Sequence, residues 1–238
     1  MPLQQTQTVS QPTAPSGSRP AVNNLLARLP RDVQQRLQSH CTRVTLETEA
    51  LLTEAGSSLS WVYLPCRGLV SLQTMTQNGE TVEVAMVGNE GIVGLPFATE
   101  STLAPHTAIV LIPGESLRMR ADALQAEFER STPLQRALVQ YWTVLMTEIA
   151  QGSACHRFHT ARQRLARWLL AASDRTQTAR IELTQERLAQ VLGIQRTWVT
   201  VASVALQDAG AIKSRHGRIT IIDRRRLESL TCECYRLS

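Results

Sequence analysis

Lysine, aromatic residues and cysteine are scarce in this chain of 238 residues. Lys213 is the only lysine, and aromatic residues make up 4% of the sequence. The five cysteines are Cys41, Cys66, Cys155, Cys232 and Cys234. They are too few and too scattered for a disulfide framework in a chain of this length, so we expect reduced thiols.

Long apolar runs are also missing. No apolar run approaches the roughly 18 residues that span a bilayer. The first twenty residues, MPLQQTQTVSQPTAPSGSRP, lack the cationic start and the apolar stretch of a secretory signal. We therefore expect a cytoplasmic protein without membrane contact. Residues 1–20 hold almost no bulky apolar groups, and we expect them to be a disordered tail.

Short motifs typical of enzymes are missing as well. The sequence contains no Gly-x-Ser-x-Gly elbow, no phosphate loop and no His-Glu-x-x-His helix. We expect no enzyme, although this test does not detect catalytic residues that stand far apart in the sequence.

Charge is distributed unevenly along the chain. Residues 1–154 hold ten basic and thirteen acidic side chains, net −3, whereas residues 155–238 hold fifteen basic and seven acidic side chains, net +8. A basic C-terminal third behind an acidic body is typical of a polyanion-binding module attached to another domain. Almost all the cations are arginines, which favour bidentate contact with phosphate or guanine, although GC-rich coding gives the same bias.

Hydrophobic patterning divides the remaining chain into three parts and predicts an α+β fold. Residues 21–130 begin with helical spacing, broken near Pro30, and continue in short alternating runs that favour an antiparallel β-roll. The runs are WVYLP (61–65), GLVSLQTM (68–75), TVEVAMV (81–87) and TAIVLIP (107–113). The pair Asn78-Gly79 suits a type I′ hairpin turn, in which both central residues have positive φ.

Residues 131–158 are predicted to form one long helix that starts at Thr132-Pro133. An apolar stripe along it predicts a dimer interface, although a helix that simply packs on its own roll has the same pattern. The expected interface residues are Leu134, Leu138, Tyr141, Leu145 and Ile149.

Residues 159–238 contain the most informative stretch, ELTQERLAQVLGIQRTWVTVASVALQDAGAIKSRHGRITII (182–222). Thr184 is placed to cap a first helix, Gly193 to end it, and Gly210 to follow a second helix that begins near Gln195. The spacing Gln185, Ala189, Gly193, Val199 is that of a helix-turn-helix. The alternating segment that follows predicts a wing, which completes a winged helix-turn-helix.

Such a fold presents the start of its second helix to the major groove of DNA. In the predicted interface, Arg196 is placed to bind guanine and the amides at Thr184 and Gln185 to bind a phosphate. The expected DNA-binding residues are Thr184, Gln185, Gln195, Arg196, Thr197, Thr200, Val201, Lys213, Arg215, His216 and Arg218. A winged helix that docks another protein, in an effector-binding signalling protein, is the alternative.

The order of these parts resembles the Crp/Fnr family of bacterial transcription regulators. The resemblance is carried by YLPCRGLVSL (63–72), NGETVEVAMVGNEGIVGLP (78–96), RQRLARWLL (162–170) and the helix-turn-helix. It implies a cyclic-nucleotide-binding-like roll that receives a small-molecule effector signal, a homodimer on a two-fold symmetric operator, and RNA polymerase as a partner. It also implies that Arg196 reads bases; Thr197 and Val201 depart from the family pattern.

The resemblance also allows a test for cyclic AMP. Family members that bind it carry a Gly-Glu pair and an Arg-Ser or Arg-Thr pair, and the matching positions here are Gly94-Leu95 and His106-Thr107. No lysine or arginine stands between Gly68 and Leu117. An anionic ligand needs a cation or converging amides, so we expect no cyclic AMP site, and the effector is unknown.

Two groups of potential metal ligands remain. Cys155 and His159 stand one helical turn apart, and Cys232 and Cys234 form a close pair. Neither group alone supplies the three or four ligands of a zinc or iron site, so we expect no metal and no cofactor. The N-terminal cysteine cluster of the oxygen-sensing branch of the family is absent, because Cys41 is the only thiol before Cys66.

Overall fold

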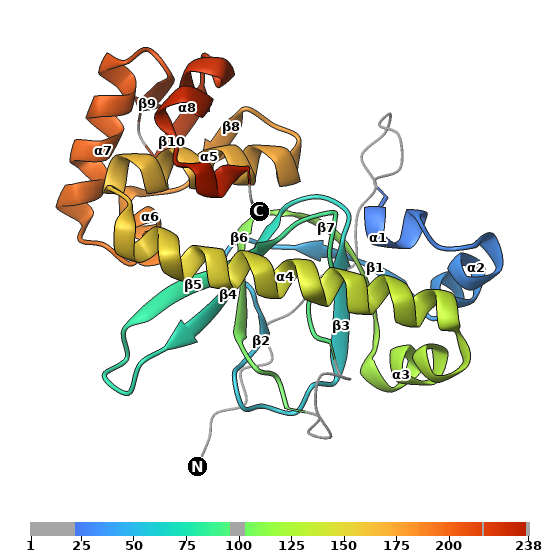
Figure 1. The fold of residues 1–238 in the computed structure, drawn as a ribbon. Helices are drawn as coiled ribbons and strands as arrows, with labels where there is room; N and C mark the ends of the chain where they lie inside the picture. The colour runs from blue at the N-terminus through green and yellow to red at the C-terminus, as the bar shows by residue number, and fades with distance from the viewer. Residues whose placement is uncertain (1–21, 96–102, 216, 237–238) are drawn as a thin grey trace. The chain divides into compact units, whose positions relative to one another are not determined.

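A computed structural model of the chain shows two compact units (Figure 1). The structure describes residues 22–95, 103–215 and 217–236. The first unit falls within two segments, Met1–Val70 and Val87–Ala137. The second unit falls within Ser71–Met86 and Leu138–Ser238. The expected tail, residues 1–20, lies outside the described residues. No helix in the described part is long and apolar enough to cross a membrane.

The first unit consists of antiparallel strands and short helices. Its elements are α1 (Asn24–Ala27), α2 (Arg31–Ser39), β1 (Thr42–Leu46), β2 (Leu51–Thr53), β3 (Trp61–Pro65), β6 (Thr107–Ile112), β7 (Gly114–Arg120) and α3 (Ala121–Arg130). Strand β7 is central in the order β1-β7-β3, and β2 pairs with β6 through an irregular register. The antiparallel strands confirm the expected class of fold.

Asn23 fixes the start of the first unit. Its side chain accepts a hydrogen bond from the backbone of Leu26 as the N-cap of α1, and its amide donates to the carbonyls of Pro65 and Gly91 at 2.9 and 2.8 Å. The side chain is fully buried, and these bonds satisfy its polar atoms. The predicted break follows, with Pro30 directly before the first residue of α2.

Strands β4 (Leu69–Met75) and β5 (Thr81–Val87) form a hairpin that lies largely in the second unit. The predicted type I′ turn is wrong, because Gly79 has a φ of 83° whereas Asn78 is not among the residues with positive φ. The Gly79 amide donates to the Thr76 carbonyl at 3.0 Å, and the Thr76 amide donates to Glu80 at 2.9 Å. The loop is thus longer than two residues and needs only one left-handed position.

The remaining second unit is mainly helical. Its elements are α4 (Thr132–Phe158), which begins in the first unit, α5 (Ala161–Thr176), β8 (Arg180–Glu182), α6 (Gln185–Leu192), α7 (Arg196–Asp208), β9 (Ile212–Arg215), β10 (Arg218–Ile221), α8 (Arg224–Leu230) and the 3₁₀ turn η1 (Glu233–Tyr235). The three strands form an antiparallel sheet in the order β8-β10-β9. The core of this helical part consists of side chains with no exposed surface, namely Leu165, Leu169, Val199, Leu206 and Leu227. The long helix and the winged helix-turn-helix are as predicted.

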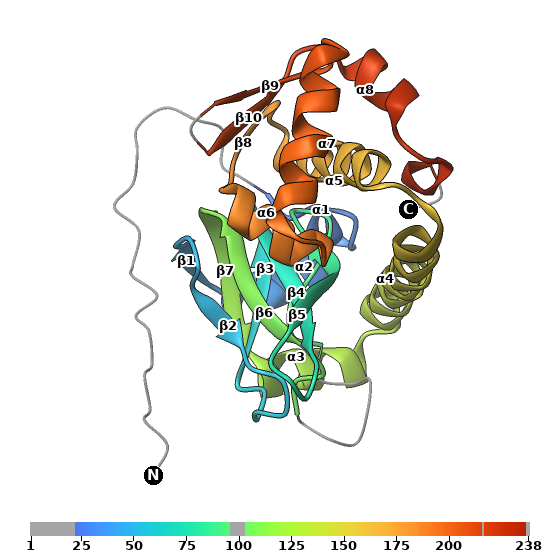
Figure 2. The same ribbon diagram turned by 90° about the vertical axis from the view of Figure 1, so that its left-hand side faces the viewer.

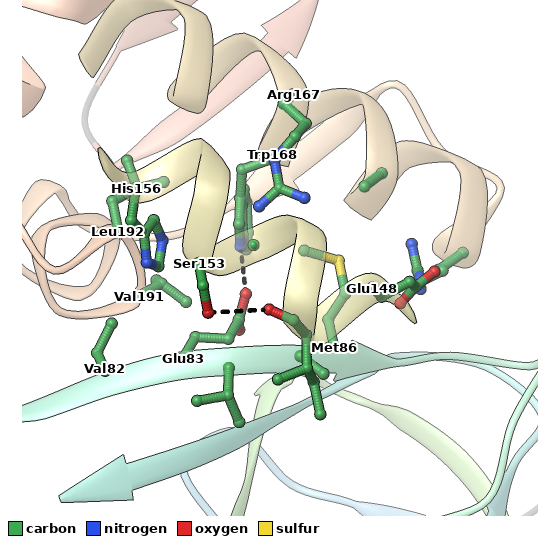
Figure 3. A pocket seen from close by; sticks show the side chains of 16 residues that line it. Val82, Glu83, Met86, Glu148, Ser153, His156, Arg167, Trp168, Val191 and Leu192 are labelled. Carbon is green, nitrogen blue, oxygen red and sulfur yellow. Dashed lines mark hydrogen bonds and ion pairs between the residues drawn. The ribbon is translucent and has the colours of Figure 1, made fainter. Parts of the chain in front are cut away.

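A buried carboxyl group lies between β5 and α5, in a pocket of about 180 Å³ (Figure 3). The indole N–H of Trp168 donates to Glu83 at 2.8 Å, and the Ser71 hydroxyl donates to its other oxygen at 2.6 Å. Burial raises the pKa of Glu83 to about 7, although these two hydrogen bonds act in the opposite direction. The hairpin and α5 are thereby joined through a titratable group.

Candidate nucleic-acid interface

Helices α6 and α7 are bounded by the residues that the sequence indicates. The Thr184 hydroxyl accepts a hydrogen bond from the Arg187 amide at 3.2 Å, which caps α6. Gly193 ends α6 with a φ of 57° and a ψ of 45°, a left-handed conformation that suits glycine. Helix α7 follows after Gln195, its N-cap. The short turn places the start of α7 directly after the end of α6.

The inner face of α7 is held by apolar packing. Val199, Ala202 and Leu206 are 0 to 2% exposed, and their helical spacing places them on one face of α7. Arg164 of α5 donates a hydrogen bond to the carbonyl of Leu192, the last residue of α6. That bond satisfies one of the carbonyls left unpaired at the end of a helix and ties α5 to the turn.

The outer face of α7 is open to solvent. Gln195, Arg196, Thr197, Thr200 and Val201, all predicted to contact DNA, are exposed. The Arg196 guanidinium makes no hydrogen bond or ion pair with the residues that the structure describes. A cation at the start of a helix, without an internal partner, is available to an external acceptor.

A groove of about 490 Å³ runs along this face. It lies between the start of α6, the outer side of α7 and the β9–β10 hairpin, which are close together in Figure 2. Its lining includes five of the predicted residues, namely Thr184, Gln185, Arg196, Thr200 and Arg215. Gln195, Thr197, Val201, Lys213 and Arg218 do not line it. The structure therefore brings half of the described predicted residues into one concave surface.

Three of the predicted residues, Gln185, Thr200 and Arg218, already have hydrogen-bond partners in the chain. The Thr200 hydroxyl lies 3.0 Å from Gln185 Oε1, which links the two helices. The Arg218 Nε donates to Glu182 at 3.1 Å across the β8–β10 pair. Hydrogen bonds from Arg180 and Arg218 lower the pKa of the Glu182 carboxyl, which is therefore a stable counter-charge. Arg218 is thus less available to a phosphate than the sequence suggests.

The hairpin carries the remaining predicted cations. Lys213 and Arg215 are exposed on β9, whereas His216 lies outside the described residues. The Gln207 side chain of α7 accepts a hydrogen bond from the Ser214 amide at 2.8 Å. The hairpin is therefore attached to α7 by a contact that the sequence analysis missed, because it joins a helix end to a strand with no recognisable spacing.

Two exposed apolar residues on α7 were also missed. Trp198 is 56% exposed and Val204 is 47% exposed. The signal was available in the sequence, because a tryptophan that follows Arg196 and Thr197 does not fit the buried positions of the helix. Together with Val201, 59% exposed, they give the outer side of α7 an apolar component.

The predicted dimerisation residues of α4 lie mostly inside the protomer. Leu134, Leu138 and Leu145 are 1, 2 and 6% exposed, and Tyr141 and Ile149 are half-buried. Side chains that are covered within their own chain have little surface left for a partner, and the assignment of these residues to a dimer interface stays a prediction. The exposed large apolar side chains among the described residues of α4 are Val139, Val144 and Phe158.

Comparison with known proteins agrees with this geometry. Residues 163–230 match the family model of the Crp-like helix-turn-helix domain. No curated protein sequence matches the chain.

Solved structures extend the likeness to most of the chain. FixK2 from Bradyrhizobium japonicum has a TM-score of 0.69 at 17% identity, covering 81% of this chain and 98% of that chain. The c-di-GMP responsive global regulator CLP of Xanthomonas campestris has a TM-score of 0.66 at 16% identity, covering 81% and 99%. A CRP/FNR family transcriptional regulator from Thermus thermophilus has a TM-score of 0.64 at 19% identity, covering 79% and 97%. Residues 163–230 are thus a Crp-like helix-turn-helix domain, and the chain has the fold of the Crp/Fnr transcription regulators.

Proposed function

We propose that the protein regulates transcription by binding a two-fold symmetric DNA operator as a homodimer, with α7 of each subunit in the major groove. The observation that carries the proposal is Arg196, which is exposed at the start of α7 without a partner among the described residues, on the rim of a groove lined by polar residues of α6 and β9. The major groove is about 12 Å wide and admits one helix. A net charge of +8 over residues 155–238 favours a polyanionic partner.

Each exposed residue of α7 has a chemically suitable partner in DNA. Arg196 is placed to donate two hydrogen bonds to guanine O6 and N7, and Gln195 to bind adenine or a phosphate. Thr200 and Val201 offer methyl groups to thymine. Free amides at the start of α6, near Gln185, suit a phosphate.

The hairpin supplies the sequence-independent part of binding. Lys213 and Arg215 are exposed on β9, and we assign them to the phosphate backbone. Arg218 contributes less, because its interaction with Glu182 has to be exchanged for a phosphate.

The homodimer, RNA polymerase and an effector belong to the same proposal. Val139 and Val144, 59 and 50% exposed on α4, are the surface that we assign to the second subunit. We infer that the complex acts on RNA polymerase in the cytoplasm and responds to a small molecule received by a sensor domain of residues 21–130. No catalytic role is proposed.

Cyclic AMP is not the effector that we propose. The Thr107 hydroxyl accepts a hydrogen bond from the Ala55 amide at 3.2 Å, and burial lowers the pKa of His106, which disfavours its charged form. These two positions correspond to the phosphate-binding pair of the family. A ring whose charged form is disfavoured, beside a hydroxyl that already accepts a hydrogen bond, is a poor site for a phosphodiester.

Binding to duplexes selected from a random pool tests the proposal. We expect an enriched palindrome, and we expect Arg196→Ala to weaken specific binding by about 1 to 3 kcal/mol and to relax the preference at one base pair of each half-site. Arg215→Ala should weaken all duplexes by similar factors. Arg225→Ala, which removes an exposed arginine of α8 outside the groove, is the control and should change little. Full discrimination by the Arg196→Ala protein would remove this residue from the interface.

Trp198 is the observation that favours the alternative, in which α7 docks another protein. An exposed tryptophan is typical of protein interfaces. Absence of any duplex retention at low salt would favour this alternative, and salt-dependent retention would exclude it as the main function.

A further inference from the structure

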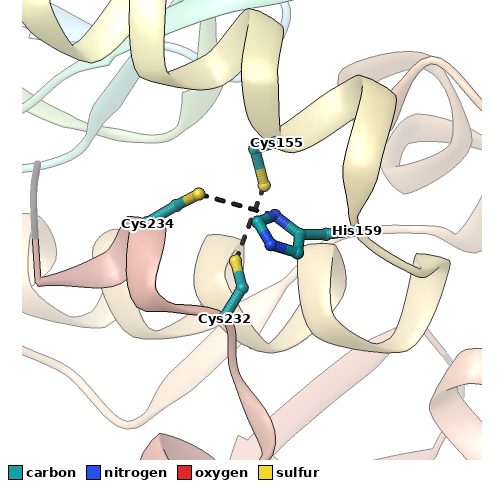
Figure 4. Close-up of side chains that lie close together, drawn as sticks. All are labelled: Cys155, His159, Cys232 and Cys234. Atoms are coloured by element: carbon teal, nitrogen blue, oxygen red, sulfur yellow. Dashed lines mark hydrogen bonds between the residues drawn. The ribbon is translucent and has the colours of Figure 1, made fainter.

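Three cysteines and a histidine converge at the end of α4 (Figure 4). Cys155 lies in the last turn of α4, and His159 follows the end of this helix at Phe158. Cys232 and Cys234 lie at and within η1. The four side chains point toward one another, and their ligand atoms all lie within 4.8 Å of one another. Cys155 and Cys232 stand 77 residues apart, so their spacing does not reveal the cluster.

The distances within the cluster are those of a tetrahedral site. Zinc binds sulfur at about 2.3 Å and nitrogen at about 2.0 Å, so in a tetrahedron two sulfurs lie roughly 3.8 Å apart and a sulfur and a nitrogen roughly 3.5 Å apart. The structure has Cys155 Sγ and Cys232 Sγ at 3.6 Å, and Cys234 Sγ and His159 Nδ1 at 3.5 Å. All the other pairs of ligand atoms lie within 4.8 Å, so shifts of about 1 Å or less bring the four atoms around one ion.

The surroundings resemble the outer shell of a metal site. His159 Nε2 lies 3.2 Å from a Glu233 carboxylate oxygen, which leaves Nδ1 facing the thiols. Metal-bound histidines commonly donate their second N–H to a carboxylate in this way. The Gln151 amide donates to Cys234 Sγ at 3.0 Å.

Burial and charge are consistent with a closed site. Cys155 and Cys234 have no exposed surface, Cys232 is 3% exposed, and the His159 side chain is 15% exposed. Three thiolates, a neutral imidazole and a divalent ion carry a net charge of −1. Arg167 lies close enough to act electrostatically on Cys155. A nearby guanidinium therefore balances the charge of the occupied site.

We propose that Cys155, His159, Cys232 and Cys234 bind one zinc ion, which fastens the end of α4 to the C-terminal segment. All four positions are protein ligands, as in structural rather than catalytic zinc sites. An iron–sulfur cluster would separate the ligand atoms by several iron and sulfide ions, which does not agree with atoms within 4.8 Å of one another. The ion would hold the turn between α4 and α5 in place, next to the helix-turn-helix.

Metal analysis of the full-length protein, purified under reducing conditions without chelators, tests the site directly. We expect one zinc per chain by mass spectrometry, released by a mercurial that modifies thiols. Cobalt(II) added to the metal-depleted protein should give the intense visible bands of a tetrahedral ion and the near-ultraviolet bands of sulfur ligands. Both readouts are independent of DNA binding, so their failure is distinguishable from failure of the proposed function.

Variants assign the ligands. Cys232→Ser and Cys234→Ser should lose the zinc, whereas Cys41→Ser, which alters a half-buried cysteine outside the cluster, should retain it. Glu233→Gln should keep the stoichiometry but weaken affinity by roughly 10- to 100-fold. This last variant keeps all four ligands, so it tests the site even where a cysteine variant fails to fold.

Three outcomes would overturn the proposal. One is protein that neither contains zinc nor takes up zinc or cobalt after reduction. Another is a disulfide between Cys155 and Cys232 in protein whose free thiols were alkylated at cell lysis, before they could oxidise during purification. The third is iron with sulfide in place of a single ion.

Discussion

Glu83 is a buried carboxyl group whose proton links pH to stability. Burial raises its pKa from 4.5 to about 7, so the folded protein binds this proton more tightly than the unfolded chain. The stabilisation is complete below pH 4.5 and is lost as the pH rises through 7, at about 1.4 kcal/mol per pH unit in between. Relative to Glu83→Gln, we expect the wild-type free energy of unfolding to fall by about 3 kcal/mol between pH 4.5 and pH 8.5.

Denaturant titrations of both proteins across this range measure the effect. His156, whose burial lowers its pKa to about 4, titrates in both proteins and cancels in the difference. Glu186→Gln, which removes an exposed carboxylate of α6, is the control for loss of a charge. Parallel stability curves for wild type and Glu83→Gln would show that Glu83 titrates as an ordinary glutamate.

Individual contacts could be predicted only where they follow from local spacing. The exposure of Arg196 and the burial of Val199 follow from helical periodicity, and both are confirmed. The interaction of Arg218 with Glu182 depends on the pairing of β8 with β10, which is set by tertiary structure. The contact between Cys155 and Cys232 is also set by tertiary structure, because the two residues stand 77 residues apart in the sequence.

The turn between α6 and α7 depends on Gly193 for two separate reasons. Its φ of 57° is left-handed, and a Cβ built on it would lie 2.9 Å from Val82 Cγ2 of β5. Gly210 has a φ of 69°, but a Cβ added there would meet open space. Replacing Gly210 with alanine therefore measures only the conformational cost of a left-handed residue. Gly210→Ala should lower the free energy of unfolding by about 1 to 2 kcal/mol, and Gly193→Ala by more.

Chemical denaturation measures the free energy of unfolding of Gly193→Ala, Gly210→Ala, Val82→Ala and the double variant Val82→Ala/Gly193→Ala. In the Val82→Ala background, the cost of Gly193→Ala should fall to that of Gly210→Ala, because the close contact is gone. Equal costs for both glycines in the wild-type background would mean that β5 does not approach the turn.

Boundaries of helices and strands were predictable where capping residues mark them. Thr184, Gly193 and Gly210 bracket the two helices of the motif as expected. The loop at Asn78 was mispredicted, because an Asn-Gly pair fits more than one hairpin geometry and the loop length is set by the register of β4 and β5. Helix α8 and η1 were not predicted, since their short segments carry little periodicity.

Across the whole chain, the sequence predicted the order of the parts and the charge difference between them. It did not predict which side of α4 is open. Three leucines of the apolar stripe that predicts a dimer interface are buried within the chain, because burial inside a protomer and burial between subunits select the same residues. Only the structure separates the two.

The open side of α4 provides the final test of how two copies of the chain assemble. Val139 and Val144 are separated by about 140° around α4, so they are expected to contact opposite edges of a second subunit packed on this helix. Replacing both with glutamate then places like charges across the symmetry axis. We expect light scattering to show a dimer for the wild type and a monomer for the double variant, with the dissociation constant raised roughly tenfold or more. Ile222→Glu, at an apolar residue 61% exposed beyond β10, should leave the dimer intact. A double variant that stays dimeric at wild-type concentrations would show that the interface lies on another face of the chain. The two copies of α7 would then bind a palindromic duplex with a different spacing.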